Sequence, residues 1–462
     1  MIIDIKVALE GVLGHSAALI RLFNGGHEKS NLTTLGDCGI GDGSKLFAAL
    51  DSVLPQQAFG WGIQLFGEFK NDDSRAKDLV EKCLQGMLMG VMPRLAQDGS
   101  GGTYVLRDAS HTAVAVFKPE DEEPFAPNNP KRYVGTQMFQ RGLRKGISSG
   151  EAASREVAAF ILDTGSFSGV PFTTRVEACH PSFCYRNHDR HAPLPLKVGS
   201  LQSFVEYTDT ASDFGPQVFP NREVHKIGIL DIRLVNTDRN DGNILVQNRS
   251  SQTFLIPVDH GYCLPDVFEI AWCDWVWIHW PQAQRPFDQE TLDFIDSIDI
   301  DGDVQLLRQK LSIRDAPLQI MRMTCMTLKI GAAAGLNLYE IATIIARDNL
   351  DAPSLLETIV LQAKALALSC KKKQKEPPSL VRSTSSFDIS MMKAGVSSPA
   401  SDSKDCPLSS SSEALWDSVF WKYFDILIRQ VIDKKASVKA KFPNLERSLR
   451  YRRYSYSLGR DS

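Results

Sequence analysis

The sequence predicts an α+β fold in two lobes, a β-rich first lobe followed by a helical second lobe. Short runs of alternating apolar residues recur between residues 99 and 208, as in half-buried strands. Apolar residues at steps of three and four fill most of 304–367, which is the spacing of amphipathic helices. With 462 residues, 43% of them hydrophobic, the chain can build a substantial core.

The expected elements follow one another along this plan. Helical spacing predicts helices and alternation predicts strands, with loop residues such as Gly, Pro and Asp between them. The helices are expected at 76–95, 150–162, 221–234, within 304–367 and around 415–427, and the strands at 103–106, 112–117, 170–178, 197–207, 244–247 and 254–258.

The same patterns divide the chain into four parts. These are 1–75, with no assigned domain; 76–370, the two-lobed domain with lobes at about 99–208 and 209–370; 371–413, a linker; and 414–462, an amphipathic helix with a basic tail. The linker is rich in Ser, Lys and Pro and poor in large apolar residues. Such a composition buries too little surface to offset chain entropy, so we expect disorder there.

Overall charge and cysteine usage narrow the class of protein. A formal net charge of -3 gives no reason to expect nucleic-acid binding, and nine scattered cysteines fit reduced thiols inside the cell. The N-terminal apolar stretch is interrupted by charges, unlike a signal peptide. No window of about 18 apolar residues predicts a transmembrane helix. We expect a cytoplasmic protein whose contact with membranes is peripheral.

The strongest chemical signal is Asp238 followed five positions later by Asn243, at the start of an apolar strand. This is the spacing of the kinase catalytic loop, in which the Asp orients or deprotonates the attacking hydroxyl and the Asn holds magnesium. Ordinary turns are also rich in Asn, Asp and Gly, so the spacing alone is weak evidence.

A second acidic residue, Asp259, stands sixteen residues further on, after the apolar run 254–258. At the end of a buried strand, with Gly261 just beyond, its carboxylate can reach a magnesium ion that bridges ATP phosphates. A simple strand-ending turn is the alternative. The order and spacing relative to Asp238 and Asn243 favour the magnesium role.

A lysine and a glycine pair complete the predicted nucleotide site. Lys118 shares an otherwise apolar strand face and needs an anion there, which ATP phosphates supply; an edge lysine that reaches solvent is the alternative. The turn Gly101-Gly102-Thr103 lets backbone amides approach phosphates. Glu156, beside the apolar face of the next helix, is our predicted partner for Lys118, and Glu151 is the rival.

These segments resemble the phosphatidylinositol 3/4-kinase family, most closely the plant phosphatidylinositol 4-kinase gamma group, which is similar to type II phosphatidylinositol 4-kinases. The blocks that carry the resemblance are 101–104, 116–124, 155–159, 199–206, 224–227, 230–233, 238–245 and 256–265. The resemblance implies a bilobal protein-kinase-like fold and an adenine-binding hinge at Gln202, Ser203, Phe204 and Val205. It also implies an activation loop from Asp259 to about Arg285, whose Trp residues we expect to pack in the core.

The resemblance implies ATP-dependent phosphorylation of phosphatidylinositol at the inositol 4-hydroxyl, with Mg²⁺ as cofactor. Asp238, Lys118 and Glu156 would be catalytic; Asn243 and Asp259 would hold the metal. A protein Ser/Thr kinase on the same scaffold, or a nucleotide-binding scaffold with little turnover, are the alternatives. Two features depart from relatives: residues 119–150 contain no cysteine for palmitoylation, and 1–75 show no ubiquitin-like module.

The sequence does not decide the role of two further clusters. One gathers potential zinc ligands within thirteen residues, at a spacing that fits no standard finger: Cys179, His180, Cys184, His188 and His191. The other is the basic, aromatic tail at 434–456, which could meet anionic lipid head groups or simply be solvated.

Overall fold

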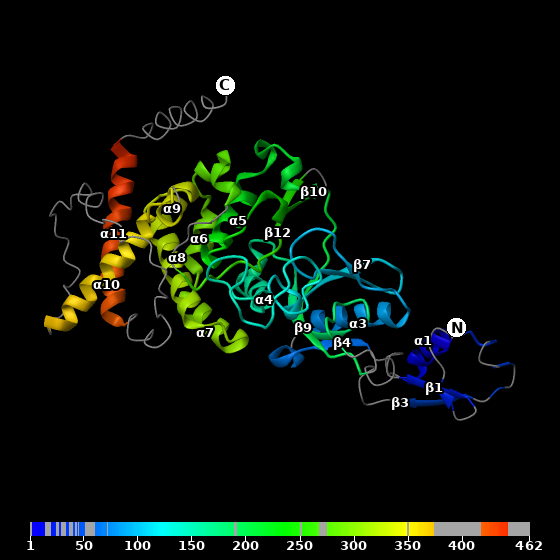
Figure 1. Ribbon diagram of the computed structural model, residues 1–462. Coiled ribbons are helices and arrows are strands. Elements are labelled where there is room, and N and C mark those ends of the chain that lie inside the picture. Colours follow the sequence, from blue (N-terminus) through cyan, green and yellow to red (C-terminus); the bar gives the residue numbers. More distant parts are fainter. Residues whose placement is uncertain are drawn as a thin grey trace, which may run out of the picture. The chain divides into compact units, whose positions relative to one another are not determined.

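The computed structural model describes residues 2–13, 20–24, 27–28, 34–36, 40–41, 44, 46–50, 61–71, 73–188, 192–249, 252–267, 275–348, 351–373 and 417–441. The chain divides into two compact units, residues 1–268 with 272–325, and residues 326–462 with 269–271. Figure 1 shows the elements of each. No helix among the described residues is long and apolar enough to cross a membrane.

The β-rich lobe is built on one six-stranded antiparallel sheet in the order β4-β8-β9-β7-β6-β5. Its strands are β4 (Gly62–Leu65), β5 (Arg94–Leu95), β6 (Tyr104–Arg107), β7 (Ala113–Pro119), β8 (Thr173–Cys179) and β9 (Lys197–Ser203). Because β4 pairs with β8, this lobe begins earlier than the predicted boundaries at 76 and 99. The short strand β4 was missed since four residues carry little periodicity.

Two helices pack against this sheet. The helix α3 (Ser74–Leu88) contributes Ala76, Leu79, Cys83 and Met87 to a core cluster with side chains of β6, β7 and β8. The helix α4 (Ala152–Leu162) contacts β8 and β9 and lies in a second cluster together with α5, α7 and α8. One helix therefore completes the core of the sheet, and the other joins the sheet to the helical lobe.

The helical lobe of the first unit combines a small sheet with four helices. The sheet has the order β10-β11-β12, from β10 (Asp209–Thr210), β11 (Ile244–Arg249) and β12 (Gln252–Pro257). The helices are α5 (Asn221–Leu234), α6 (Gln289–Ser297), α7 (Ile300–Leu311) and α8 (Asp315–Ala333). These elements confirm the predicted α+β, bilobal architecture.

The remaining elements belong to the second unit and to the N-terminal region. The second unit contains α9 (Leu338–Ile345), α10 (Leu355–Lys373) and α11 (Ser418–Lys441), and α10 packs on α11. The N-terminal region holds α1 (Ile2–Leu13), β1 (Ile20–Asn24), β2 (His27–Glu28) and β3 (Phe47–Leu50). The division between the two compact units falls between Cys325 and Met326, inside α8. The predicted second lobe at 209–370 therefore contains residues of both units. Most of the predicted linker, from 374 onward, lies outside the described residues.

Candidate active site

Lys118 lies near the end of β7, on the face of the sheet opposite α3. Ala115 and Phe117 of the same strand are fully buried in the cluster that includes α3, and side chains alternate along a strand. On the other face, Lys118 Nζ donates to Glu156 Oε1 at 2.5 Å and to Asp259 Oδ1 at 3.2 Å. The structure thus brings together three predicted site residues from β7, α4 and the segment after β12.

The charges of this group support one another. Burial by itself would lower the pKa of Lys118, but the negative charges of Asp259 and Glu156 outweigh burial and raise that pKa above its ordinary value. Burial would likewise raise the pKa of Glu156, yet the Lys118 charge outweighs burial and lowers it. Both groups are therefore ionised at neutral pH, and Lys118 is a fixed cation beside Asp259.

Glu156, rather than its rival Glu151, is the partner of the lysine. Its second oxygen, Oε2, accepts the backbone N–H of His260 at 3.0 Å, so one carboxylate ties β7 to the residue after Asp259. Glu151 instead pairs with Arg155 and Arg314, both at 2.9 Å.

Asp238 and Asn243 lie on the loop between α5 and β11. After α5, Val235 turns the chain with a left-handed backbone of φ 50°. The Asn236 side-chain oxygen then accepts the Asp238 N–H at 2.9 Å, and Asn243 Nδ2 donates to the Asp238 carbonyl at 2.8 Å. The predicted spacing of five therefore closes a braced loop, which holds Asp238 in a defined position.

The Asp238 carboxylate has an unpredicted neighbour. Arg144 Nη2 donates to Asp238 Oδ1 at 2.5 Å. Burial raises the pKa of Asp238, and the charge of Asp259 raises it further, while Arg144 acts in the opposite direction; the net direction is upward. No local pattern in the sequence links Arg144 to a loop 94 residues away.

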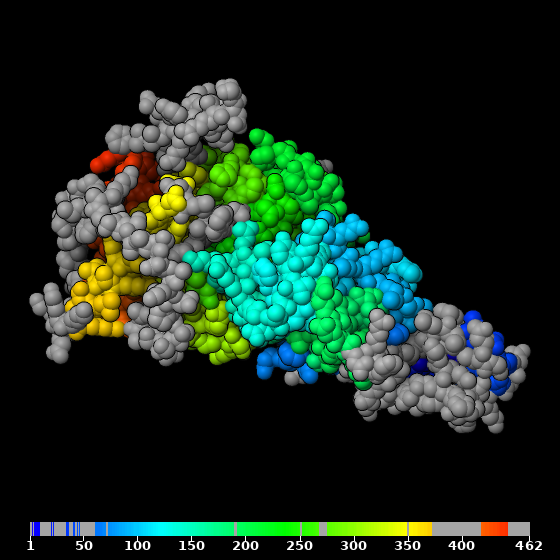
Figure 2. All heavy atoms as spheres, viewed as in Figure 1, coloured from blue at the N-terminus to red at the C-terminus, as the bar shows by residue number. Residues whose placement is uncertain are grey.

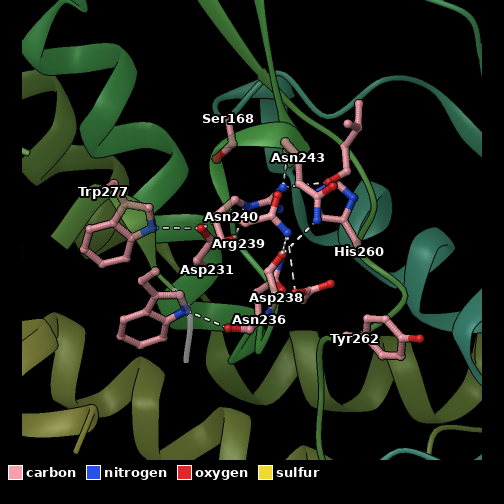
Figure 3. Close-up of polar contacts among 12 residues, drawn as sticks. Ser168, Asp231, Asn236, Asp238, Arg239, Asn240, Asn243, His260, Tyr262 and Trp277 are labelled. Atoms are coloured by element: carbon pink, nitrogen blue, oxygen red, sulfur yellow. Dashed lines mark hydrogen bonds and ion pairs between the residues drawn. The ribbon is translucent and has the colours of Figure 1, made fainter. Parts of the chain in front are cut away.

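Arg239 is a second residue that the sequence did not predict, and its hydrogen bonds hold the loop between α5 and β11. Figure 3 shows it between Asp231 on one side and Asn243 on the other. Its Nε donates to both Asp231 oxygens at 3.0 and 3.1 Å, and its Nη1 donates to the carbonyls of Asn243 at 2.7 Å and Val258 at 2.6 Å. One buried guanidinium thus fixes the end of the predicted catalytic loop and the end of β12.

Tryptophans of the predicted activation loop support the same arrangement. Trp277 Nε1 donates to Asp231 Oδ2 at 2.9 Å, and Trp275 Nε1 donates to the Asn236 carbonyl at 2.6 Å. These two and Trp280 are buried, which confirms that they pack in the core. Trp272 lies outside the described residues.

The backbone at Asp259 is strained in a way that sets its side chain. Its φ of 57° is in the left-handed region, which is uncommon for a non-glycine residue and frequent at functional sites. The preceding Val258 is held on both sides, because its N–H donates to the Asn243 carbonyl at 3.1 Å and its own carbonyl accepts from Arg239. The left-handed backbone thus falls on the residue whose carboxylate faces Lys118.

The donor set suits a hard divalent cation. Asn243 uses its side-chain nitrogen on the Asp238 carbonyl, so the amide oxygen is the atom it can offer to a cation, and Asp259 supplies a carboxylate. Among the described residues, no three His, Cys, Asp or Glu side chains form a metal cluster. Two protein oxygens with phosphate oxygens and water are nevertheless the usual ligand set of Mg²⁺ in phosphoryl-transfer sites.

The glycine turn before β6 is anchored on the η3 helix (Glu120–Glu122). Gly102 N–H donates to the Glu122 carbonyl at 2.9 Å, and a Cβ on Gly102 would lie 2.2 Å from Glu122 Oε2. Glu122 itself accepts from Tyr104 Oη at 2.6 Å and pairs with Lys197 at 3.2 Å. Gly102 is therefore required by close packing on Glu122, a reason that the sequence did not reveal.

The predicted hinge begins where β9 ends. Gln202 Nε2 donates to Thr173 Oγ1 at 2.9 Å, and the amide of Phe204 donates to the Val114 carbonyl at 2.9 Å. The Ser203 N–H donates to the Phe172 carbonyl at 2.8 Å. Among the described residues, no hydrogen bond engages the amide or carbonyl of Val205.

In the described part of the cysteine and histidine cluster, His180 is held by aromatic packing. His180 is buried between Trp61 and Phe183, with ring centroids at 5.6 and 5.9 Å, and its Nδ1 accepts the Ser182 N–H at 3.0 Å. His191 lies outside the described residues.

Comparison with known proteins agrees with this geometry. The family model for phosphatidylinositol 3- and 4-kinase matches residues 99–341, slightly more than half of the chain. The chain belongs to the phosphatidylinositol 3- and 4-kinase family. The match starts just before the glycine turn and includes Lys118, the predicted catalytic loop and Asp259.

This family member is similar to several plant proteins. It is 43% identical over 306 residues to phosphatidylinositol 4-kinase gamma 3 of Arabidopsis thaliana, covering 63% of this chain and 53% of the relative. It is 41% identical over 300 residues to phosphatidylinositol 4-kinase gamma 4 of Oryza sativa subsp. japonica, covering 62% and 51%. The chain thus spans about half the length of these curated relatives.

A solved structure with some likeness is the Helicobacter pylori proinflammatory kinase CtkA. The TM-score is 0.29 and the identity 12%, over 54% of this chain and 92% of that one.

Proposed function

We propose that this chain transfers the γ-phosphoryl group of ATP to the inositol 4-hydroxyl of phosphatidylinositol. The observation that carries the proposal is the convergence of Lys118, Glu156 and Asp259 through contacts of 2.5 and 3.2 Å, on a chain that belongs to this lipid kinase family. The plant relatives are named for the 4-kinase activity, which favours the 4-hydroxyl as acceptor.

In this proposal each side chain has one task. Lys118, ionised and oriented by Glu156, binds the ATP phosphates. The free backbone groups of Val205, with the rest of the hinge at 202–204, bind adenine, and the turn 101–103 covers the phosphates. Asp238 orients the acceptor hydroxyl and takes its proton; burial raises the pKa of its carboxyl, which makes it a stronger base for that task.

Mg²⁺ is the proposed metal, held by the side-chain oxygens of Asn243 and Asp259. When bound there, it would neutralise the charge that the phosphate oxygens carry during transfer. The chain's own contribution is to prepare two oxygen ligands, one fixed by the hydrogen bond to the Asp238 carbonyl and the other by the backbone at Asp259.

We also propose that the insertion between β7 and α4 contacts the membrane. Residues 124–150 contain no acidic residue and five cations, of which Arg144 is paired with Asp238. The segment also exposes large apolar side chains, namely Tyr133, Val134, Phe139 and Leu143. In Figure 2 this part of the first unit (cyan) lies at the molecular surface. Cations near an anionic lipid surface contribute about 1 kcal/mol each, so this surface suits a peripheral contact at the cytoplasmic leaflet, where ATP is available.

The basic residues of α11 are a weaker support for membrane contact. Lys439 pairs with Glu340 at 2.6 Å within the second unit, so its charge is already neutralised. Lys434 and Lys441 are exposed and Lys435 is half-buried, whereas the tail beyond 441 lies outside the described residues.

The proposal is tested by offering γ-labelled ATP to phosphatidylinositol vesicles and to protein substrates in parallel, with Asp238→Ala as the control. We expect label in the lipid with the unmodified chain and none with Asp238→Ala. Label in protein but not in lipid would replace lipid with protein as the acceptor. ATP binding without transfer to either would make the chain a nucleotide-binding scaffold.

A further inference from the structure

A tight turn at residues 141–148 brings Arg144 to the catalytic loop. Arg141 and Ser148 form a β-bridge, and the Gly142 N–H donates to the Ile147 carbonyl at 2.8 Å. Gly146 adopts φ 81°, a conformation that favours glycine, and Ile147 is buried. The turn is therefore a built structure within the insertion.

The turn is docked on the segment that follows Asp259. The Asp266 N–H donates to the Gly146 carbonyl at 2.8 Å. A Cβ on Gly146 would lie 2.7 Å from Val267 Cγ2, so only glycine permits this approach. Docking of the turn fixes the backbone from which Arg144 extends.

At its end, Arg144 forms an ion pair with the proposed catalytic base. The contact from Nη2 to Asp238 Oδ1 is 2.5 Å, and the two side chains are 24% and 19% exposed. Solvent and a small acceptor group can therefore reach both. While the pair persists, Oδ1 accepts from the guanidinium, which opposes proton transfer to that oxygen.

We propose that Arg144 binds the phosphodiester of the phosphatidylinositol acceptor and that this binding releases Asp238 for catalysis. The inference rests on the proposed function. The 1-phosphodiester lies across the six-membered ring from the 4-hydroxyl, so with the hydroxyl at Asp238 the guanidinium must swing away from the carboxylate, along the ring, to bind the phosphodiester. The planar N–H fork of arginine matches phosphate oxygens, with which it forms charge-assisted hydrogen bonds.

The exchange gives a balanced transfer step. The guanidinium moves from the carboxylate to the phosphodiester, and Oδ1 of Asp238 accepts the proton of the 4-hydroxyl. The hydroxyl oxygen forms its bond to the γ-phosphorus as the bond to the β–γ bridging oxygen breaks, and ADP leaves. Water carries no phosphate, so it leaves the ion pair intact and is a poor acceptor.

The test compares Arg144→Gln with Arg141→Gln in the full chain. Arg141→Gln removes the same charge from the same turn, so it controls for any general attraction between the insertion and the vesicles. The two assays are lipid phosphorylation, with phosphatidylinositol in phosphatidylcholine vesicles, and ATP hydrolysis without lipid.

We expect Arg144→Gln to raise the KM for phosphatidylinositol roughly ten- to a hundred-fold, to keep the KM for ATP, and to increase ATP hydrolysis. Arg141→Gln should raise the lipid KM by no more than about five-fold, the effect of losing one cation of the membrane-facing insertion, and should leave ATP hydrolysis without lipid unchanged.

Arg144→Lys, which keeps the charge but not the fork, should raise the lipid KM less, and it carries the test if Arg144→Gln does not fold. If Arg144→Gln leaves the KM for phosphatidylinositol unchanged while the unmodified chain phosphorylates the lipid, this inference fails and the proposed function stands. Equal losses of lipid transfer, hydrolysis and ATP affinity would also overturn it, since they indicate a structural role. If the unmodified chain hydrolyses ATP but never phosphorylates lipid, the proposed function fails and this inference with it.

Discussion

Among single residues, Glu156 links Lys118 to the segment after β12. One oxygen faces Lys118 and the other accepts from the backbone of His260. An uncharged amide of the same shape would keep the packing but lose the charge that holds the lysine.

We therefore expect Glu156→Gln to lower kcat/KM for ATP roughly ten- to a hundred-fold, because Lys118 loses a charge-assisted partner. Glu151→Gln is the matched control on the same helix, since Glu151 pairs with Arg155 and Arg314. Steady-state kinetics with varied ATP distinguish the two variants. Equal effects of both substitutions would show that Glu156 supports the helix and not the lysine.

His180 leads to a prediction about pH. Burial lowers its pKa to about 4, whereas an unfolded histidine titrates near 6.5. Between these values the unfolded chain binds the extra proton, so this residue makes the free energy of unfolding fall as pH decreases from about 6.5 to about 4. The loss should be on the order of 1–3 kcal/mol.

His180→Asn keeps an acceptor for the Ser182 N–H and removes the titration. Chemical denaturation across this pH range should show a shallower fall in stability for this variant, whereas His111→Asn, at an exposed turn, should retain the full fall. The same pH dependence in all three proteins would exclude His180 as its source.

Among the elements, the sequence predicts the loop that carries Asp238 and Asn243 better than it predicts the packing of the glycine turn. The spacing from Asp238 to Asn243 and the strand before Asp259 are local patterns, and the structure places those residues around one site. The helix that carries Glu156 was likewise predictable from its apolar face. Arg239 and Arg144 were not predictable from local patterns, because Arg239 binds Asp231 inside α5 and Arg144 reaches Asp238 from an insertion 94 residues away.

Adjacent glycines of the turn should respond differently to substitution. A Cβ on Gly102 would lie 2.2 Å from Glu122 Oε2, whereas a Cβ on Gly101 would meet nothing closer than 3.5 Å. Gly102→Ala should destabilise the fold by about 1–3 kcal/mol and raise the KM for ATP, since the turn must move.

Gly101→Ala should be tolerated in both respects. Thermal unfolding and ATP titration of the two variants test this difference. If both alanines are equally harmless, the turn adjusts freely and its packing on Glu122 does not hold it in place.

For the whole molecule, the sequence predicted the class of fold more securely than its boundaries. Alternation and helical spacing identify the two lobes because burial imposes those periods. They do not show that β4 joins the sheet from before residue 76, or that α8 crosses from one compact unit to the other. Both facts depend on long-range packing, which leaves little trace in a short window.

The central claim is that one site, formed by Lys118, Glu156, Asp238, Asn243 and Asp259, phosphorylates the inositol ring at a defined position. The most direct measurement is to deacylate the lipid product of a reaction with γ-labelled ATP and to identify the ring carbon that carries the label. We predict label on the 4-hydroxyl alone. Label at another ring position, or in protein with none in lipid, would contradict this account.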